Sequence, residues 1–71
     1  MTNNQKLIIK ILDDYSCSTA KEISKWAKQQ HNIEISPASV SGSIRALYNN
    51  GMIGKSPNAD GHMVYWINRK D

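Results

Sequence analysis

The side chains best suited to chemistry lie on one side of a predicted short helix near the middle of the chain. Arg45 carries a planar guanidinium with five donors, and Asn49, one turn later, carries an amide with donors and an acceptor. Such groups on a helix can form paired hydrogen bonds with the edges of nucleic-acid bases. The same side is otherwise small and polar, with Ser39, Ser41 and Gly42. It is therefore either a lightly charged contact surface or an ordinary solvated face.

Lysines provide a second group of candidates on the preceding predicted helix. Lys21, Lys25 and Lys28 recur at i, i+4 and i+7, so they share one flank of that helix. Because a row of ammonium groups can neutralise phosphates, this flank is either a phosphate-contacting surface or a plainly solvated one. The formal net charge of +3 favours an anionic partner only mildly. Further side chains that could contact phosphate are Ser36, Lys55, His62 and the terminal pair Arg69 and Lys70.

Catalytic and metal-binding chemistry have almost no support in the sequence. His31 and His62 lack the spacing of metal ligands, and Cys17 has no neighbour in the sequence arranged to activate its thiol. No glycine-rich phosphate-binding loop is present. We therefore predict that the protein is not an enzyme, has no catalytic residues, and requires neither a metal nor another cofactor.

Length and composition indicate one small domain. With 71 residues, 39% of them hydrophobic and 21% charged, we expect a single domain over residues 1–71, ordered from about residue 4 to residue 68. No apolar run is long enough to cross a membrane, and the first residues lack the order of a secretion signal. A single cysteine is typical of a reducing compartment. We therefore expect a cytoplasmic protein without membrane contact.

Two predicted helices precede the one that carries Arg45. The first is expected over residues 4–15, where apolar side chains recur at helical spacing. The second is expected from Ala20 to about Gln30, because Thr19 and Glu22 form a capping box at its start. The inward-facing residues of these two helices should be Ile8, Ile11, Leu12, Tyr15, Ile23, Trp26 and Ala27.

The third helix is predicted from Pro37 to about Asn50. Ser36 can cap its first turn, and Pro37 suits the first helical position because it has no N–H to leave unsatisfied. Gly51 can take the left-handed conformation that ends a helix. The predicted buried stripe, opposite the side with Arg45, consists of Val40, Ile44, Leu47 and Tyr48.

After Gly51 the hydrophobic period changes from helical to alternating, which predicts a β-hairpin. Its strands are expected over residues 52–56 and 62–68. A lone hairpin is marginally stable in water, so a third strand is expected, and residues 33–35 are the candidate. A register shifted by one residue would bury Val64 and Trp66, and the sequence does not exclude it. The preferred inward-facing residues are Ile53, Met63, Tyr65 and Ile67.

The order helix, helix, short strand, helix and hairpin resembles the winged helix-turn-helix fold, an α+β fold of many small prokaryotic and phage transcription regulators. The resemblance covers about residues 4 to 68. Two local motifs add to it. The segment TAKEI at 19–23 is similar to the start of the second helix in that family. The segments SVS at 39–41 and NGMI at 50–53 are similar to its junction between recognition helix and wing.

The resemblance implies a DNA-binding transcription regulator in the cytoplasm of a prokaryotic cell or a phage-infected host. In that family the third helix, here residues 37–50, enters the major groove of double-stranded DNA, and the hairpin, here residues 52–68, acts as a wing. The expected base contacts are Ser39, Ser41, Gly42, Arg45 and Asn49. The expected contacts to the DNA backbone are Lys21, Lys25, Lys28, Ser36, Lys55 and His62.

Two features depart from the pattern of that family. The third helix offers a single arginine, Arg45, and the turn of the hairpin carries an acidic residue, Asp60. They favour an alternative in which the same fold is a protein-interaction module, for example a phage protein that docks on a host or phage regulator. The lightly charged face of the third helix or an exposed Trp66 would then contact that partner. Trp66 or the first helix would also be the surface for a protein partner or a second copy of the chain.

Overall fold

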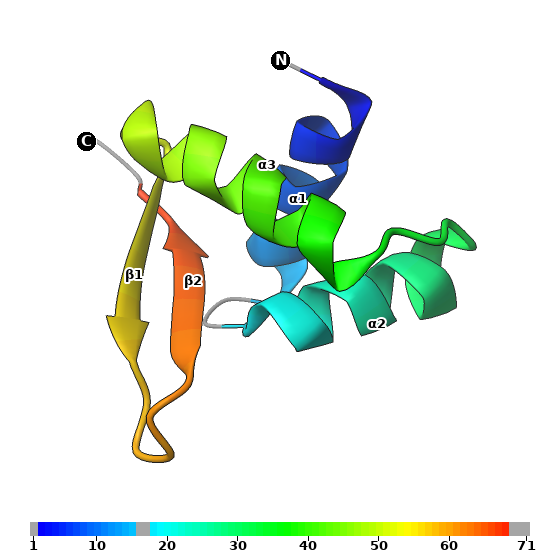
Figure 1. Ribbon diagram of the computed structural model, residues 1–71. Coiled ribbons are helices and arrows are strands. Elements are labelled where there is room, and N and C mark those ends of the chain that lie inside the picture. The colour runs from blue at the N-terminus through cyan, green and yellow to red at the C-terminus, as the bar shows by residue number, and fades with distance from the viewer. Residues whose placement is uncertain (1, 16–17, 69–71) are drawn as a thin grey trace.

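The protein folds into three helices and a hairpin, as a computed structural model that describes residues 2–15 and 18–68 shows (Figure 1). The three helices pack on one another, and the two strands form an antiparallel hairpin beside them. No helix in these two ranges is long and apolar enough to cross a membrane. In chain order the elements are α1 (Asn3–Asp14), α2 (Ala20–His31), α3 (Pro37–Asn49), β1 (Ile53–Pro57) and β2 (Met63–Ile67).

Local hydrogen bonds explain where α1 and α2 begin. The predicted capping box of α2 is confirmed: the Glu22 N–H donates to the Thr19 hydroxyl at 3.2 Å, and the Thr19 N–H donates to the Glu22 carboxylate at 3.1 Å. A second capping box, between Thr2 and Gln5, was not predicted. It starts α1 at Asn3, one residue earlier than expected.

The ends of α3 also follow from local chemistry. The Ser39 N–H donates to the Ser36 hydroxyl at 3.2 Å, and Pro37 occupies the first turn, so the predicted cap is confirmed. After α3, Gly51 has a φ of +73°, in the left-handed region that ends helices. Asn32, directly after α2, has a φ of 53° and ends that helix in the same way.

One apolar core joins the helices to the base of the hairpin. Tyr48 was predicted in this core, and that prediction is wrong, because its side chain is 43% exposed. Leu47 fills the last core position of α3, so Tyr48, about 100° further around the helix, lies beside the hairpin instead. Tyr15 and Trp26 lie at the edge of the core with their rings stacked 4.4 Å apart. The buried core residues are Ile8, Ile11, Leu12, Ile23, Ala27, Ile35, Val40, Ile44, Leu47 and Ile53.

The inner face of the hairpin confirms the preferred register for three of four residues. Ile53 is buried, and Tyr65 and Ile67 pack against the core. The prediction is wrong for Met63, which is 36% exposed. Met63 pairs with Pro57 at the end of the hairpin next to its loop, where the core no longer reaches.

Trp66 lies over the neighbouring strand. A Cβ atom at Gly54 would stand 2.5 Å from the Trp66 ring, so this close approach requires glycine at position 54. Trp66 is therefore half-buried, which corrects the expectation of an exposed tryptophan that could anchor a partner.

The predicted strand at residues 33–35 does not form. The Ile33 N–H donates to the Ala27 carbonyl at 3.0 Å, and the Ile35 carbonyl accepts from the Ser24 hydroxyl at 2.7 Å, so α2 satisfies these groups in place of a strand. Beside β2, the third position is taken by Ser18, whose carbonyl accepts from the Tyr65 N–H at 2.9 Å. The hairpin is thus supported by the residue before α2.

Candidate nucleic-acid interface

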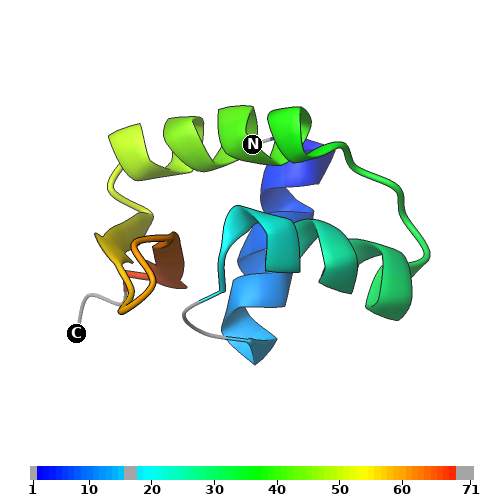
Figure 2. The ribbon, with the colours of Figure 1, turned by 60° about the horizontal axis from the view of Figure 1, so that its bottom comes forward.

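The outer side of α3 is free along the helix. Val40, Ile44 and Leu47 hold the inner side in the core, and Figure 2 shows α3 along one edge of the molecule, with no other described element on its outer side. The prediction of which side α3 presents is therefore confirmed. All five predicted base-contacting residues are exposed: Ser39, Ser41, Gly42, Arg45 and Asn49.

A hollow of about 330 Å³, here called the wing hollow, lies where α3 meets the hairpin. It brings three predicted base contacts, Ser41, Arg45 and Asn49, together with Lys55 of β1. The Arg45 guanidinium makes no hydrogen bond or ion pair within the described part of the chain, so its donors are available to a partner. The full lining is Ser41, Ile44, Arg45, Tyr48, Asn49, Lys55 and Tyr65.

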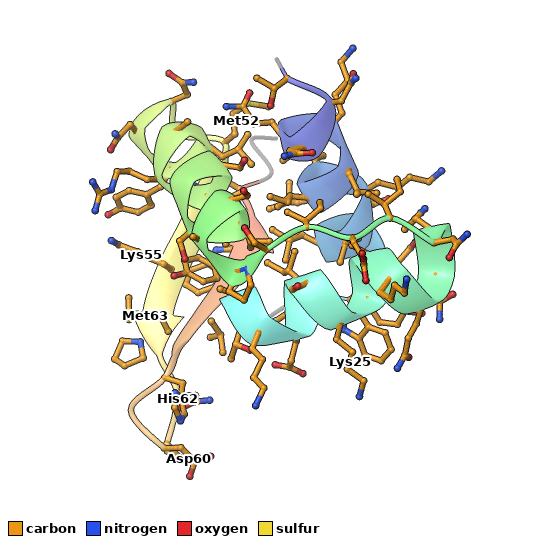
Figure 3. All side chains as sticks on the ribbon, turned by 45° about the vertical axis from the view of Figure 1, so that its right-hand side comes forward. Lys25, Met52, Lys55, Asp60, His62 and Met63 are labelled. Carbon is orange, nitrogen blue, oxygen red and sulfur yellow. The ribbon has the colours of Figure 1, made fainter. Side chains whose placement is uncertain are left out.

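A second hollow of about 550 Å³, here called the lysine groove, lies between α2 and the segment that leads into α3. It gathers four of the six predicted backbone contacts. Figure 3 shows Lys25 of α2 on one side of α3 and Lys55 of the hairpin on the other. Positive side chains therefore flank the exposed helix on both sides. The full lining is Lys21, Ser24, Lys25, Lys28, Glu34, Ile35 and Ser36.

Three of these lysines have partners within the protein. The Lys28 Nζ lies 3.4 Å from a carboxylate oxygen of Glu34, both side chains being mostly exposed. The ammonium groups of Lys25 and Lys55 lie 5.2 Å and 4.4 Å from the ring centroids of Trp26 and Tyr48. Exposed contacts of these kinds contribute about 1 kcal/mol or less each. They hold the lysines loosely and can be exchanged for contacts with phosphate.

The remaining side chains predicted to contact the DNA backbone are less available than these lysines. The Ser36 hydroxyl caps α3 and donates to the Ser39 hydroxyl at 3.0 Å, so its hydrogen-bonding capacity is largely used within the chain. His62 lies in the hairpin loop, outside both hollows (Figure 3). Arg69 and Lys70 lie outside the described residues.

Four polar or aromatic residues of the two hollows were missed as candidates from the sequence: Ser24, Glu34, Tyr48 and Tyr65. Glu34 lies within the predicted strand at residues 33–35, and no helical spacing connects it with Lys28. Tyr48 and Tyr65 were assigned to the core because they follow its spacing. Tyr48 directly follows the core residue Leu47 and stands seven positions before Lys55. An aromatic residue in this place was the available signal for the contact between Tyr48 and Lys55.

Metal ligands do not cluster in the part of the chain that the structure describes. No three side chains of histidine, cysteine, aspartate or glutamate lie close enough there to hold a metal ion. His31 is the last residue of α2, and His62 lies in the hairpin loop. Cys17 lies outside the described residues.

Gly42 allows a test of whether a binding partner lies close to α3. A Cβ atom at position 42 would meet nothing within 4 Å, so Gly42→Ala should stabilise the fold by up to about 1 kcal/mol through helix propensity. If a partner approaches the helix closely, the same methyl group should weaken binding. We expect higher stability in urea denaturation together with weaker binding of duplex DNA. Unchanged binding would show that position 42 is not in close contact with DNA.

Comparisons with known proteins give similarity at the level of structure. No family model matches the chain, and no curated protein is significantly similar to it in sequence. RosR of H. salinarum has a TM-score of 0.82 at 19% identity, over 96% of this chain and 61% of RosR. ZitR of Lactococcus lactis, a zinc-responsive MarR family member, has a TM-score of 0.78 at 25% identity, over 97% of this chain and 44% of ZitR.

A manganese uptake regulator is also similar, with a TM-score of 0.79 at 21% identity, over 100% of this chain and 52% of that protein. The chain spans about half the length of these structural relatives, which are winged-helix regulators. The predicted fold is thereby confirmed: the protein is a small winged helix-turn-helix domain.

Proposed function

We propose that the protein is a DNA-binding transcription regulator, with α3 in the major groove of double-stranded DNA and the hairpin as its wing. The observation that carries the proposal is the free outer side of α3 between two hollows lined by basic side chains. A B-DNA major groove about 12 Å wide admits one helix, and phosphates border it on both sides. The positions of the basic side chains match this arrangement.

The two hollows support separate roles for the side chains that would contact bases and those that would contact the DNA backbone. Arg45 and Asn49 project from the helix that would enter the groove, and an arginine can bond O6 and N7 of guanine together. Lys21, Lys25 and Lys28 border the other side of the helix, where they would neutralise phosphates and fix the register of binding. Affinity would come largely from the lysines and sequence preference from α3.

The wing would contact DNA through β1 more than through its loop. Lys55 is exposed on β1 and borders the same hollow as Arg45. In the loop, the Asn58 side-chain oxygen accepts from the backbone N–H groups of Asp60 and His62, which holds the loop in one shape. That shape places the acidic Asp60 at the tip (Figure 3), where it would repel phosphate.

The structural relatives support the regulatory part of the proposal, because they include a manganese uptake regulator and a zinc-responsive MarR family member. A cytoplasmic location, and a homodimer formed through α1 or the hairpin, stay predictions. Duplex DNA is the partner that the proposal requires.

Titration of random-sequence duplex DNA at two salt concentrations tests the proposal. If Lys21, Lys25, Lys28 and Lys55 each neutralise one phosphate, the affinity should fall roughly 150-fold between 50 mM and 200 mM salt. Fluorescence anisotropy of labelled DNA measures this directly. Absence of binding at low salt, or binding that salt does not weaken, would contradict DNA binding and favour the protein-interaction module.

A further inference from the structure

A carboxylate lies within the lysine groove. Glu34 is the acidic member of a lining that otherwise holds three lysines, two serines and Ile35, and its carboxylate stands 3.4 Å from the Lys28 ammonium. The formal charge of this lining is therefore +2, from three lysines and one glutamate. A phosphate entering the groove meets one fewer available cation than the lysine row suggests.

The backbone around Glu34 is fixed on both sides. Asn32 ends α2 in the left-handed conformation, and the Ile33 N–H donates to the Ala27 carbonyl. On the other side, Ile35 is buried in the core, and its carbonyl accepts from the Ser24 hydroxyl. Since both neighbours of Glu34 are held by α2, its carboxylate is confined to the vicinity of the groove.

We propose that Glu34 competes with DNA phosphates for Lys28, an inference that rests on the proposed function. Carboxylate and phosphate are both anions that accept from the Lys28 ammonium, and because the two anions repel each other, contact with one disfavours contact with the other. The ion pair is solvent-exposed, with 56% of the Lys28 side chain and 84% of the Glu34 side chain accessible. Breaking it therefore costs little free energy. In the DNA complex Lys28 is shared between Glu34 and phosphate, so on average it neutralises less than one phosphate.

This competition lowers the affinity for all duplexes alike, because Glu34 lies outside the base-contacting side of α3. It reduces retention on non-specific DNA, where backbone contacts supply nearly all of the binding. Contacts of Arg45 with bases are unaffected. Glu34 therefore lowers the overall affinity for DNA and leaves the ratio between target and random duplexes unchanged.

Glu34→Gln tests the proposal, since it removes the charge and keeps the shape. We expect two- to fivefold tighter binding of both target and random duplexes at low salt, the range in which exposed ion pairs contribute. The slope of log affinity against log salt should steepen by up to about 0.9, the value for one additional phosphate contact. A merely structural role for the pair would change thermal stability and leave that slope unchanged, which would overturn the proposal.

Two control variants separate a local effect from general charge. Asp14→Asn makes the same change in net charge at the exposed end of α1, outside the lining of the groove, and should leave binding nearly unchanged. In a Lys28→Gln background, Glu34→Gln should lose most of its effect, because the competed cation is gone. Equal gains from Glu34→Gln and Asp14→Asn, or a full gain without Lys28, would overturn the competition.

The outcome also distinguishes this inference from the proposed function. Salt-dependent binding by the unaltered protein, with no gain from Glu34→Gln, overturns the competition and leaves DNA binding intact. Absence of DNA binding by the unaltered protein and by the Glu34→Gln variant at low salt overturns both.

Discussion

Arg45→Ala is expected to cause a large loss of discrimination between a target sequence and random DNA. A bidentate arginine contact to guanine contributes about 1 to 3 kcal/mol of discrimination, which corresponds to roughly a 5- to 150-fold loss in the specificity ratio. The effect should be specific because the guanidinium is exposed and has no partner within the described residues. A target can be selected from a random duplex pool, and competition anisotropy then measures both affinities.

Lys21→Ala is the matched control for Arg45→Ala. Lys21 lines the lysine groove, outside the wing hollow that holds Arg45. Its loss should weaken binding of target and random duplexes equally and reduce the salt slope by about 0.9. If Arg45→Ala behaves in the same way as Lys21→Ala on every sequence, Arg45 contacts phosphate and reads no base.

Leu47→Ala is expected to remove most of the stability of the domain. Leu47 is 1% exposed and fills the last core position of α3, so truncation leaves a cavity among well-packed neighbours. Such changes cost about 2 to 5 kcal/mol, and domains of this size often have only about 3 to 5 kcal/mol in total. Urea denaturation followed by circular dichroism should show a population of unfolded chain without denaturant.

Asn49→Ala controls for the effect of changing α3 itself. Asn49 is exposed on the same helix, and its replacement should alter the free energy of unfolding by no more than about 0.5 kcal/mol. A loss below about 1 kcal/mol for Leu47→Ala would mean that α3 is held mainly by its other core residues, Val40 and Ile44.

Most features that depend on neighbouring residues were predicted from the sequence, although the capping box between Thr2 and Gln5 was missed. A capping box needs only Thr19 and Glu22, and the cap of α3 needs only Ser36 ahead of Pro37. Helical spacing likewise identified Val40, Ile44 and Leu47 as the buried side of α3, and hence the exposed side that carries Arg45. Both the helices and the composition of the contact face follow from such short-range rules.

Features that depend on distant partners were not predictable in this way. Ile33 and Ile35 alternate as a strand would, yet α2 takes up their backbone groups, and Ser18 takes the place beside β2. Nothing near Glu34 in the sequence shows that its carboxylate meets Lys28 across a turn. Register and pairing depend on which segments lie side by side, and local spacing does not contain that information.

The bridge between Ser18 and Tyr65 has a consequence for the order in which the chain assembles. It joins a residue before α2 to one near the end of the chain, so it can form only after a long loop has closed. Contacts between residues so far apart in the sequence form late. Closing the long loop between them costs chain entropy before the contact contributes any favourable energy. We therefore expect the three helices to assemble first and the hairpin to dock last. The same hairpin should be the first element to open, which gives the wing a freedom of movement that α3 lacks.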